Sequence, residues 1–166
     1  KWIPGFLIRY VERIIHQDEV NEHFEAQRGR NAHEFCQATM QKFDIKVKVY
    51  GQENVIQPPQ GVIFAANHPL GGFDAVAIIS FLKDIRPDLM FIVKDFLMSV
   101  ENLRERFIGV NKVGKNASES LQKVDVQFGS DTATFMFPAG LVSRKVDGEI
   151  KDWLWRKTFI SKAKKY

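Results

Sequence analysis

One strand-to-helix corner in the middle of the chain limits the possible folds more than any other feature. Residues 61–75 read GVIFAANHPLGGFDA, an apolar run that becomes polar abruptly at Asn67 and His68. Such a run is typical of a strand buried on both faces of a parallel sheet. The glycines after it predict a turn, and residues 73–82 predict a helix. Ligands of open α/β sheets bind at the carboxyl ends of strands, so His68 lies where chemistry is expected.

Short apolar segments along the rest of the chain predict further strands that alternate with helices. The expected strands are residues 45–50, 89–93, 107–110 and 132–137, and the expected helices between them are residues 95–106 and 117–128. The first of these strands alternates apolar and basic residues, as a half-exposed edge strand does. The alternation of strands and helices favours the α/β class, with a largely parallel mixed sheet flanked by helices.

The beginning of the chain predicts a helical segment in front of this core. Residues 1–15 place apolar side chains at helical spacing, and Asp18 and Asn31 are candidate N-caps of two further helices. The first helix can pack on the core or lie in a membrane interface. We therefore divide the chain into an N-terminal helical segment, residues 1–44, packed on the core or a membrane surface, and an α/β core, residues 45–166.

Composition narrows the function classes. The chain is 45% hydrophobic and 27% charged over 166 residues, which suits a folded domain with a substantial core. Its single cysteine, Cys36, cannot form an intrachain disulfide, and no apolar run approaches the ~18 residues of a membrane span. The single cysteine is compatible with a reducing cytoplasm, and any membrane contact would be peripheral; we expect a cytoplasmic protein on the inner face of the membrane.

The net charge of +4 is concentrated near the end of the chain. Residues 150–165 are amphipathic and face either the core or a lipid surface, and their basic side chains are Arg156, Lys157, Lys162, Lys164 and Lys165. Such a cluster suits phosphates or an anionic membrane, although a solvated helix face is the more common explanation. No closing strand follows this segment, so we expect the core to be incomplete at its C-terminus.

His68 and Asp74 form the first candidate pair. Asp74 lies in the first turn of the predicted helix, where the helix dipole favours its ionised form. The glycine-rich turn can fold this carboxylate back toward His68, fixing the ring's tautomer and leaving the other nitrogen free as a general base. The alternatives are a capping role for Asp74 and a structural role for His68. The gathering of asparagine, histidine, two glycines and aspartate on one corner favours function.

Two more strand ends carry polar or glycine-bearing corners. The carboxyl ends of parallel strands share one edge of a sheet, so we expect the corners to gather a base, a fixed positive charge and a basic loop around one cleft. The three corners are Asn67 with His68, Asn111 with Lys112, and Pro138 to Gly140 followed by Ser143, Arg144 and Lys145.

Three motifs in these corners, taken in order, resemble those of a known family. NHPLGGFD at residues 67–74 looks like the histidine–aspartate motif of the glycerolipid acyltransferase superfamily, of the lysophosphatidic acid acyltransferase type. FIGVNK at 107–112 resembles its second block, and FPAGLVSR at 137–144 resembles its phosphate-binding block. The wording NHPLGG and FPAG is most similar to the branch named for hemolysins and aminolipid acyltransferases. The resemblance covers most of the chain after about Phe6.

The resemblance implies acyl transfer from a thioester of acyl carrier protein or coenzyme A to an amine or hydroxyl of a lipid precursor. It implies a peripheral membrane contact and no bound cofactor, because the acyl thioester is a co-substrate. The implied catalytic residues are His68 and Asp74. The implied substrate-binding residues are Asn67, Lys112, Gly140, Ser143 and Arg144.

The sequence departs from the family pattern where the acceptor is held. Five residues separate the histidine from the aspartate instead of four, and Lys112 replaces an arginine. Ala139, Leu141 and Val142 stand where the family has residues associated with binding glycerol phosphate. The acceptor therefore stays open between a lysophospholipid and an amino-acid-derived lipid precursor.

Other function classes have weaker support. A serine hydrolase would need a G-x-S-x-G elbow, which the sequence lacks. A non-catalytic module that binds lipid or an anionic membrane is the main alternative, because of the basic C-terminal end and its tryptophans. Nothing resembles a nucleic-acid-binding motif, so no nucleic acid is expected. We expect no metal site, because His16, His23 and His33 have no partner at ligand spacing.

Overall fold

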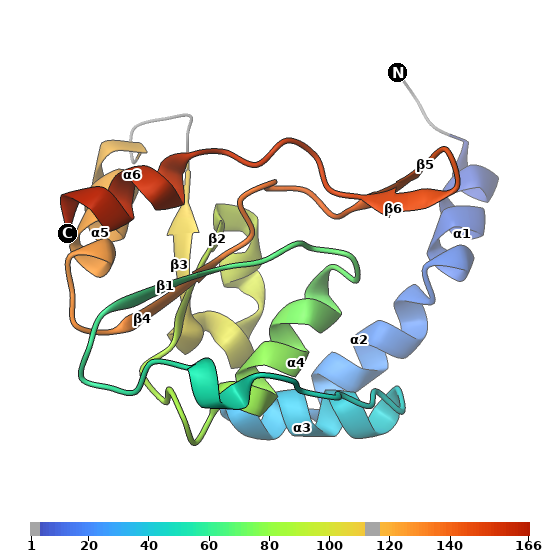
Figure 1. Ribbon diagram of the computed structural model, residues 1–166. Helices are drawn as coiled ribbons and strands as arrows, with labels where there is room; N and C mark the ends of the chain where they lie inside the picture. Colours follow the sequence, from blue (N-terminus) through green and yellow to red (C-terminus); the bar gives the residue numbers. More distant parts are fainter. Residues whose placement is uncertain (1–3, 112–116) are drawn as a thin grey trace.

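The computed structural model describes residues 4–111 and 117–166, and its centre is a four-stranded parallel sheet (Figure 1). The strands lie in the order β1-β4-β2-β3, and every neighbouring pair is parallel. Their bounds are β1 Val62–Ala65, β2 Met90–Lys94, β3 Phe107–Val110 and β4 Ala133–Met136. This arrangement confirms the α/β class and the strands expected at these places, while the edge strand that we expected at residues 45–50 is absent.

Helices cover both faces of the sheet. Helix α4 (Gly72–Leu82) carries the chain from β1 past β4 to β2, and α5 (Ala117–Phe128) carries it back from β3 to β4. Because parallel crossovers are right-handed, two crossovers in opposite directions place their helices on opposite faces. Helix α3 (Ala32–Lys42) packs on α4, and the C-terminal helix α6 (Thr158–Lys165) lies beside α5 (Figure 1).

Stacked aromatic rings fill the centre of the core. Phe91 of β2 and Phe135 of β4 stack with their ring centroids 4.9 Å apart, and both are buried. Phe35 and Cys36 of α3 belong to the same buried cluster. Burial raises the pKa of the Cys36 thiol to about 12, so this cysteine is an inert core side chain. The division of the chain at residue 44, into a helical segment and an α/β core, stays a prediction.

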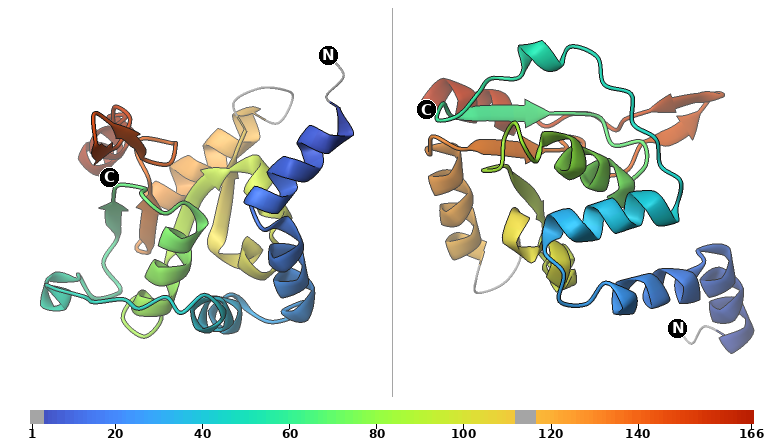
Figure 2. Two further views of the ribbon diagram at one scale, coloured as in Figure 1. Left: turned by 90° about the vertical axis from the view of Figure 1, so that its right-hand side faces the viewer. Right: turned by 90° about the horizontal axis from the view of Figure 1, so that it is seen from below.

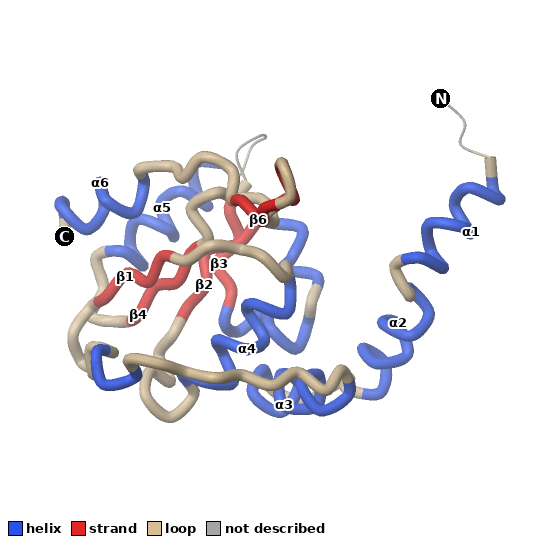
Figure 3. Tube along the Cα trace, turned by 45° about the vertical axis from the view of Figure 1, so that its right-hand side comes forward, coloured by secondary structure: helices blue, strands red, loops and turns tan. Residues whose placement is uncertain are grey.

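The N-terminal helices behave differently from α3. Helices α1 (Gly5–Ile14) and α2 (Gln17–Ala26) lead away from the body of the molecule (Figure 3). The prediction of Asn31 as a cap is confirmed, because its side chain accepts from the backbone N–H of Glu34 in a capping box. The prediction of Asp18 as an N-cap was wrong, because α2 begins at Gln17 and Asp18 lies in its first turn. A single left-handed residue, His16 at φ 52°, precedes α2, so the chain turns directly from one helix into the next.

Three other predictions of secondary structure were wrong, because the local sequence pattern did not show which contacts the residues make in the folded chain. Residues 45–50, all of them described, run as an extended loop without a strand partner. The predicted helix at 95–106 is two 3₁₀ helices, η2 (Asp95–Ser99) and η3 (Glu101–Arg106), because Val100 between them is extended. The buried side chain of Asn102 anchors η3 by donating to the carbonyls of Gln27 and Arg30.

The third failure concerns the C-terminal end. The expected basic loop after Ser143 is a β-hairpin of β5 (Arg144–Val146) and β6 (Glu149–Lys151), and only Thr158–Lys165 of the amphipathic segment is helical. Asp147 and Gly148 at the tip have φ values of 51° and 85°. Two positive φ values at a two-residue tip are typical of a tight hairpin turn, for which Asp-Gly is a strong signal. No helix among the described residues is long and apolar enough to cross a membrane.

Candidate active site

His68 and Asp74 meet at the carboxyl end of β1. His68 follows the strand and Asp74 lies in the first turn of α4, and His68 Nδ1 is 2.9 Å from Asp74 Oδ2. With Asp74 ionised and the ring neutral, Nδ1 donates to the carboxylate, which only accepts hydrogen bonds, and Nε2 keeps its lone pair. Asp74 Oδ2 also accepts from the backbone N–H of Leu70 at 2.9 Å. The predicted contact between the two side chains is therefore present, and its geometry leaves one ring nitrogen available as a base.

A glycine turn makes this contact possible. Gly71 precedes α4 at φ 64° and ψ −127°, a conformation that side-chain-bearing residues rarely adopt. A Cβ on Gly71 would make only an ordinary van der Waals contact with Val142, at 3.5 Å, so it is the backbone conformation that favours glycine here. The turn reverses the chain within a few residues, which brings the carboxylate of Asp74 to Nδ1 of the His68 ring.

The ring of His68 is held by an aromatic neighbour. Phe137, which follows β4, stacks on His68 with the ring centroids 3.8 Å apart and the planes 18° apart. The side chains of His68 and Asp74 remain 18% and 12% exposed. The pair is therefore sheltered on one face by Phe137 and still accessible to a substrate.

The backbone of His68 is held from the far end of the chain. Its carbonyl accepts from the backbone N–H of Ser143 at 2.8 Å, and its N–H donates to Asp152 Oδ1 at 3.3 Å. The Ser143 hydroxyl also donates to Asp152 Oδ1, and the indole N–H of Trp155 donates to Asp152 Oδ2 at 2.6 Å. Burial alone would raise the pKa of the Asp152 carboxyl, but these hydrogen bonds outweigh it and lower that pKa.

The remaining predicted substrate-binding residues lie in different settings. Asn67 is exposed, and its amide forms no hydrogen bond with any described residue. Gly140 adopts φ 68°, and its N–H donates to the carbonyl of Phe137 at 2.9 Å. Arg144 is exposed on β5, directly opposite Lys151 of β6. Lys112 lies outside the described residues.

Sequence reasoning missed Asp152 and Trp155. Asp152 reaches His68 across 84 residues, and no local motif surrounds it. A signal did exist in the Asp147-Gly148 dipeptide, because a hairpin centred there pairs Arg144 with Lys151 and so sets the flanking positions 143 and 152 opposite each other.

Some side chains of the predicted basic cluster at the C-terminus form ion pairs within the molecule. Lys162 and Lys165 of α6 pair with Asp125 of α5, the latter at 2.8 Å, and the Tyr166 hydroxyl donates to the same carboxylate at 2.7 Å. Hydrogen bonds from Lys162, Lys165 and Tyr166 hold the pKa of Asp125 well below its usual range. This cluster fastens α6 to α5, which weakens the case for a free anionic-surface site.

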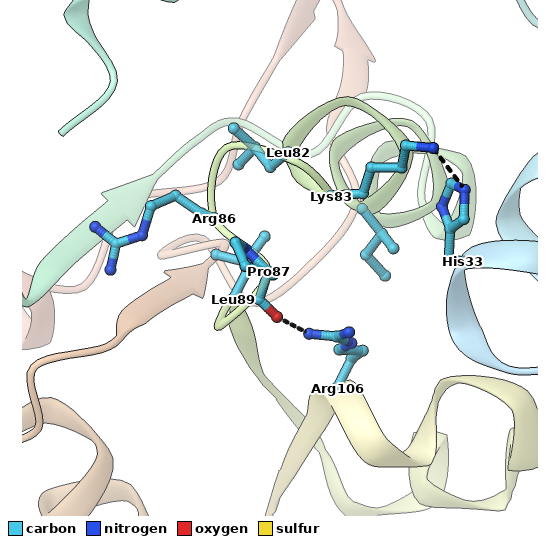
Figure 4. A pocket seen from close by; sticks show the side chains of 8 residues that line it. His33, Leu82, Lys83, Arg86, Pro87, Leu89 and Arg106 are labelled. Atoms are coloured by element: carbon cyan, nitrogen blue, oxygen red, sulfur yellow. Dashed lines mark hydrogen bonds between the residues drawn. The ribbon is translucent and has the colours of Figure 1, made fainter. Parts of the chain in front are cut away.

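A pocket lies away from His68 and Asp74 (Figure 4). Its lining includes His33, Lys83 and Arg106, with Lys83 Nζ 3.2 Å from His33 Nε2. These residues lie near the amino ends of β2 and β3, whereas His68 lies beyond the carboxyl end of β1. Within residues 4–111 and 117–166, no three side chains of His, Cys, Asp or Glu gather as metal ligands would.

Comparison with known proteins identifies relatives over the whole chain. A family model described as an acyltransferase matches residues 1–166. Two curated relatives, from Phocaeicola vulgatus and Bacteroides thetaiotaomicron, are each 39% identical over 165 residues, or 98% of this chain. Both are named lyso-glycine lipid O-acyltransferase. The chain spans 58% and 60% of the lengths of these two relatives.

Proposed function

The chain belongs to the acyltransferase family whose model covers its full length, and on that premise we propose that it transfers a fatty acyl chain to a lyso-lipid acceptor. One observation carries the mechanism. His68 Nδ1 is engaged by Asp74 at 2.9 Å, while Nε2 has no hydrogen-bond partner among the described residues. A ring oriented in this way is suited to removing a proton from an incoming nucleophile.

The reaction is a direct displacement. The acceptor hydroxyl oxygen attacks the thioester carbonyl carbon while His68 Nε2 takes the hydroxyl proton. Asp74 stabilises the resulting imidazolium and keeps the ring oriented. The tetrahedral intermediate then collapses, the carbon–sulfur bond breaks, and the proton passes to the departing thiolate. No acyl-enzyme forms, so the site supplies a base, positioning and stabilisation of the developing oxyanion.

The acceptor is proposed to be a hydroxyl on an amino-acid-derived lyso-lipid. Both relatives carry the name of an O-acyltransferase for a lyso-glycine lipid, whose amino-acid headgroup differs from glycerol phosphate. The replacements Ala139, Leu141 and Val142 fit the same difference. Arg144 and Lys112 are the proposed counter-charges for an anionic headgroup, with Asn67, Gly140 and Ser143 forming the rest of the acceptor site.

The donor is proposed to be an acyl thioester of acyl carrier protein or coenzyme A, used at the inner face of the membrane. Helix α1 supports a peripheral contact, because Phe6, Tyr10 and Ile14 are all exposed on it. Trp153 and Leu154, after the β5–β6 hairpin, are exposed as well. In Figure 1 the β5–β6 hairpin and α1 both lie at the right-hand end of the molecule. Both views of Figure 2 show that the two elements are apart from each other.

These exposed apolar side chains also favour the second candidate, a module that binds membranes without catalysis. Replacing His68 distinguishes the two functions. A binding module would show liposome binding without acyl transfer, and changing His68 would alter neither property. An acyltransferase would lose transfer and keep liposome binding when His68 is replaced.

The test is an acyl-transfer assay with the full-length protein. Radiolabelled acyl carrier protein or acyl coenzyme A is supplied with a lyso-glycine lipid, with a lysophospholipid, or without an acceptor. We expect label in the diacylated glycine lipid and little free fatty acid in the last arm. Labelled phospholipid instead would contradict the proposed amino-acid-derived acceptor. Rapid release of fatty acid without an acceptor would indicate a hydrolase. No labelled product with any acceptor would contradict acyl transfer.

A further inference from the structure

His68 belongs to a segment that has no regular secondary structure to hold it. It lies between β1, which ends at Ala65, and α4, which begins at Gly72. Its backbone N–H and C=O therefore have no partner in a strand ladder or a helix, and such groups must find one elsewhere when they are sheltered from water. The base of the β5–β6 hairpin supplies both partners, from Ser143 on one side and Asp152 on the other.

These two residues flank the hairpin. Ser143 directly precedes β5 and Asp152 directly follows β6, and the hydrogen bond from the Ser143 hydroxyl to Asp152 closes the base between them. Trp155 fixes the second oxygen of Asp152 at 2.6 Å, and the backbone N–H of Arg156 donates to the carbonyl of Pro138 at 3.1 Å. The carboxylate is thus held in one place by groups on both sides of the hairpin.

We propose that Asp152 is a positioning residue for His68, acting with Ser143 as a clamp on the backbone of the catalytic histidine. The proposal rests on the proposed function of His68 as the general base. Asp74 orients the ring from one side, and the clamp orients the backbone that carries the ring. The two carboxylates therefore have different tasks, because Asp74 touches the imidazole whereas Asp152 touches only the main chain of His68.

The clamp also assigns a role to Ser143 that differs from substrate binding. A hydroxyl has a single proton to donate, and that of Ser143 is directed at Asp152. Its backbone N–H is directed at His68. Ser143 consequently acts on the acceptor only through its remaining acceptor capacity, and its main effect is on the position of His68.

The decisive variant is Asp152→Asn in the full-length protein. The asparagine is nearly isosteric, but its NH₂ group must face either the two donors at Oδ1, from His68 and Ser143, or the indole N–H of Trp155 at Oδ2. We expect kcat for acyl transfer to fall by about 10- to 100-fold while KM stays within about twofold, because misplacing a base mainly affects the chemical step. The matched control is Glu149→Gln, which removes the same charge from β6 and leaves kcat at the wild-type value.

A second readout does not depend on activity. The Nδ1 proton of His68, held in its hydrogen bond to Asp74, gives a downfield proton NMR signal that His68→Ala removes. We expect Asp152→Asn to broaden or shift this signal and Glu149→Gln to leave it unchanged. A residue needed only for stability would lower the melting temperature, with kcat per folded molecule and this signal both preserved, and that result would overturn the proposal.

Two further variants cover the case in which Asp152→Asn does not fold. Ser143→Ala removes only the hydroxyl of the clamp, and Trp155→Phe removes the indole N–H together with the five-membered part of the ring. We expect each to lower kcat by about fivefold, the usual effect of one lost hydrogen bond. Wild-type kcat in both would equally contradict the clamp.

The outcomes separate this proposal from the one on which it rests. If His68→Ala transfers acyl chains as fast as the wild type, the proposed base is wrong and the clamp has no catalytic role. If His68→Ala is inactive while Asp152→Asn matches Glu149→Gln in kcat and in the NMR signal, only the clamp fails.

Discussion

The two ends of the parallel sheet each hold a carboxylate against a basic side chain, and they use the pair differently. At the amino end, Arg86 binds Asp88 through two hydrogen bonds of 2.9 and 2.6 Å. At the carboxyl end, His68 meets Asp74 through one bond of 2.9 Å. The side chain of Arg86 is 0% exposed, whereas that of His68 is 18% exposed.

The difference lies in what remains unsatisfied. Arg86 Nη1 donates to the carbonyls of Ile56 and Gln60 at 2.9 Å each, so all three guanidinium nitrogens are engaged. Asp88 also accepts from the backbone N–H of Ala133 at the start of β4. The Arg86–Asp88 pair thus fastens the chain entering β1 to the start of β4. The His68–Asp74 pair leaves one ring nitrogen free. A general base requires such a free nitrogen, whereas a structural ion pair does not.

The sharpest test of this contrast is His68→Ala. We expect kcat to fall by about 100- to 10,000-fold, the usual effect of losing a general base, with cooperative unfolding retained. The measurement is steady-state transfer of a labelled acyl chain together with thermal melting. His16→Asn is the matched control, because His16 is an exposed imidazole at a left-handed position that asparagine tolerates. Equal activity of His68→Ala and the control would refute the assignment.

Arg86→Met should give the opposite pattern. It leaves a carboxylate and two carbonyls without their buried partner, so the free energy of unfolding should fall by about 3–5 kcal/mol. Urea denaturation measures the loss, and kcat per folded molecule should be unchanged. Arg28→Met, at an exposed ion pair with Glu25, serves as the control and should change stability by less than about 0.5 kcal/mol. A stable Arg86→Met variant with impaired kcat would reverse the roles of the two ends.

Asp74→Asn probes the catalytic pair alone. The amide NH₂ would face His68 Nδ1, favouring the tautomer with the proton on Nε2, which can no longer accept one. We expect kcat to fall by about 10- to 1,000-fold, less than for His68→Ala, because the orienting carboxylate contributes less than the base. Asp84→Asn, a highly exposed aspartate near the other end of α4, is the control. A wild-type rate in Asp74→Asn would show that the contact is structural.

The smallest expected effect is a change in acid stability. Hydrogen bonds from Arg86 lower the pKa of Asp88, against the opposing effect of burial. A lowered folded-state pKa means that the carboxylate stabilises the fold above its unfolded pKa of about 3.9 and that this contribution disappears as pH falls further. Asp88→Asn should therefore lower the free energy of unfolding by about 1–3 kcal/mol near neutral pH.

That gap between Asp88→Asn and the wild type should begin to narrow below about pH 4, because the wild-type carboxyl then takes up a proton on unfolding, and it should close as pH falls through the lowered folded-state pKa. Urea unfolding at a series of pH values measures it. A gap that is constant from neutral to acidic pH would indicate that the loss comes from packing and not from the charge of Asp88.

The parts that were predictable share one property. The corner at residues 61–82 was predicted because its strand, its glycine turn, its helix and the contact of Asp74 with His68 all depend on residues close together in the sequence. The capping box at Asn31 is local in the same way. Apolar runs and caps act over a few residues, so their effect can be inferred without the fold.

The failures depend on distant partners. Residues 45–50 have the alternation of a strand but no neighbouring strand to pair with. Residues 95–106 have helical spacing, yet the contacts of Asn102 with the loop before α3 accompany two shorter turns instead. Periodicity describes which face a side chain occupies and does not supply a partner.

The active site divides along the same line. The proposed base, its orienting carboxylate and the turn between them follow from one short stretch of amino acids, because helix, turn and strand preferences act locally. The stacking of Phe137 and the clamp formed by Ser143 and Asp152 come from the second half of the chain, 75 to 84 residues away in the case of the clamp. Only the folded sheet and its hairpin bring them to His68, because a contact across that separation depends on the path of the whole chain between them.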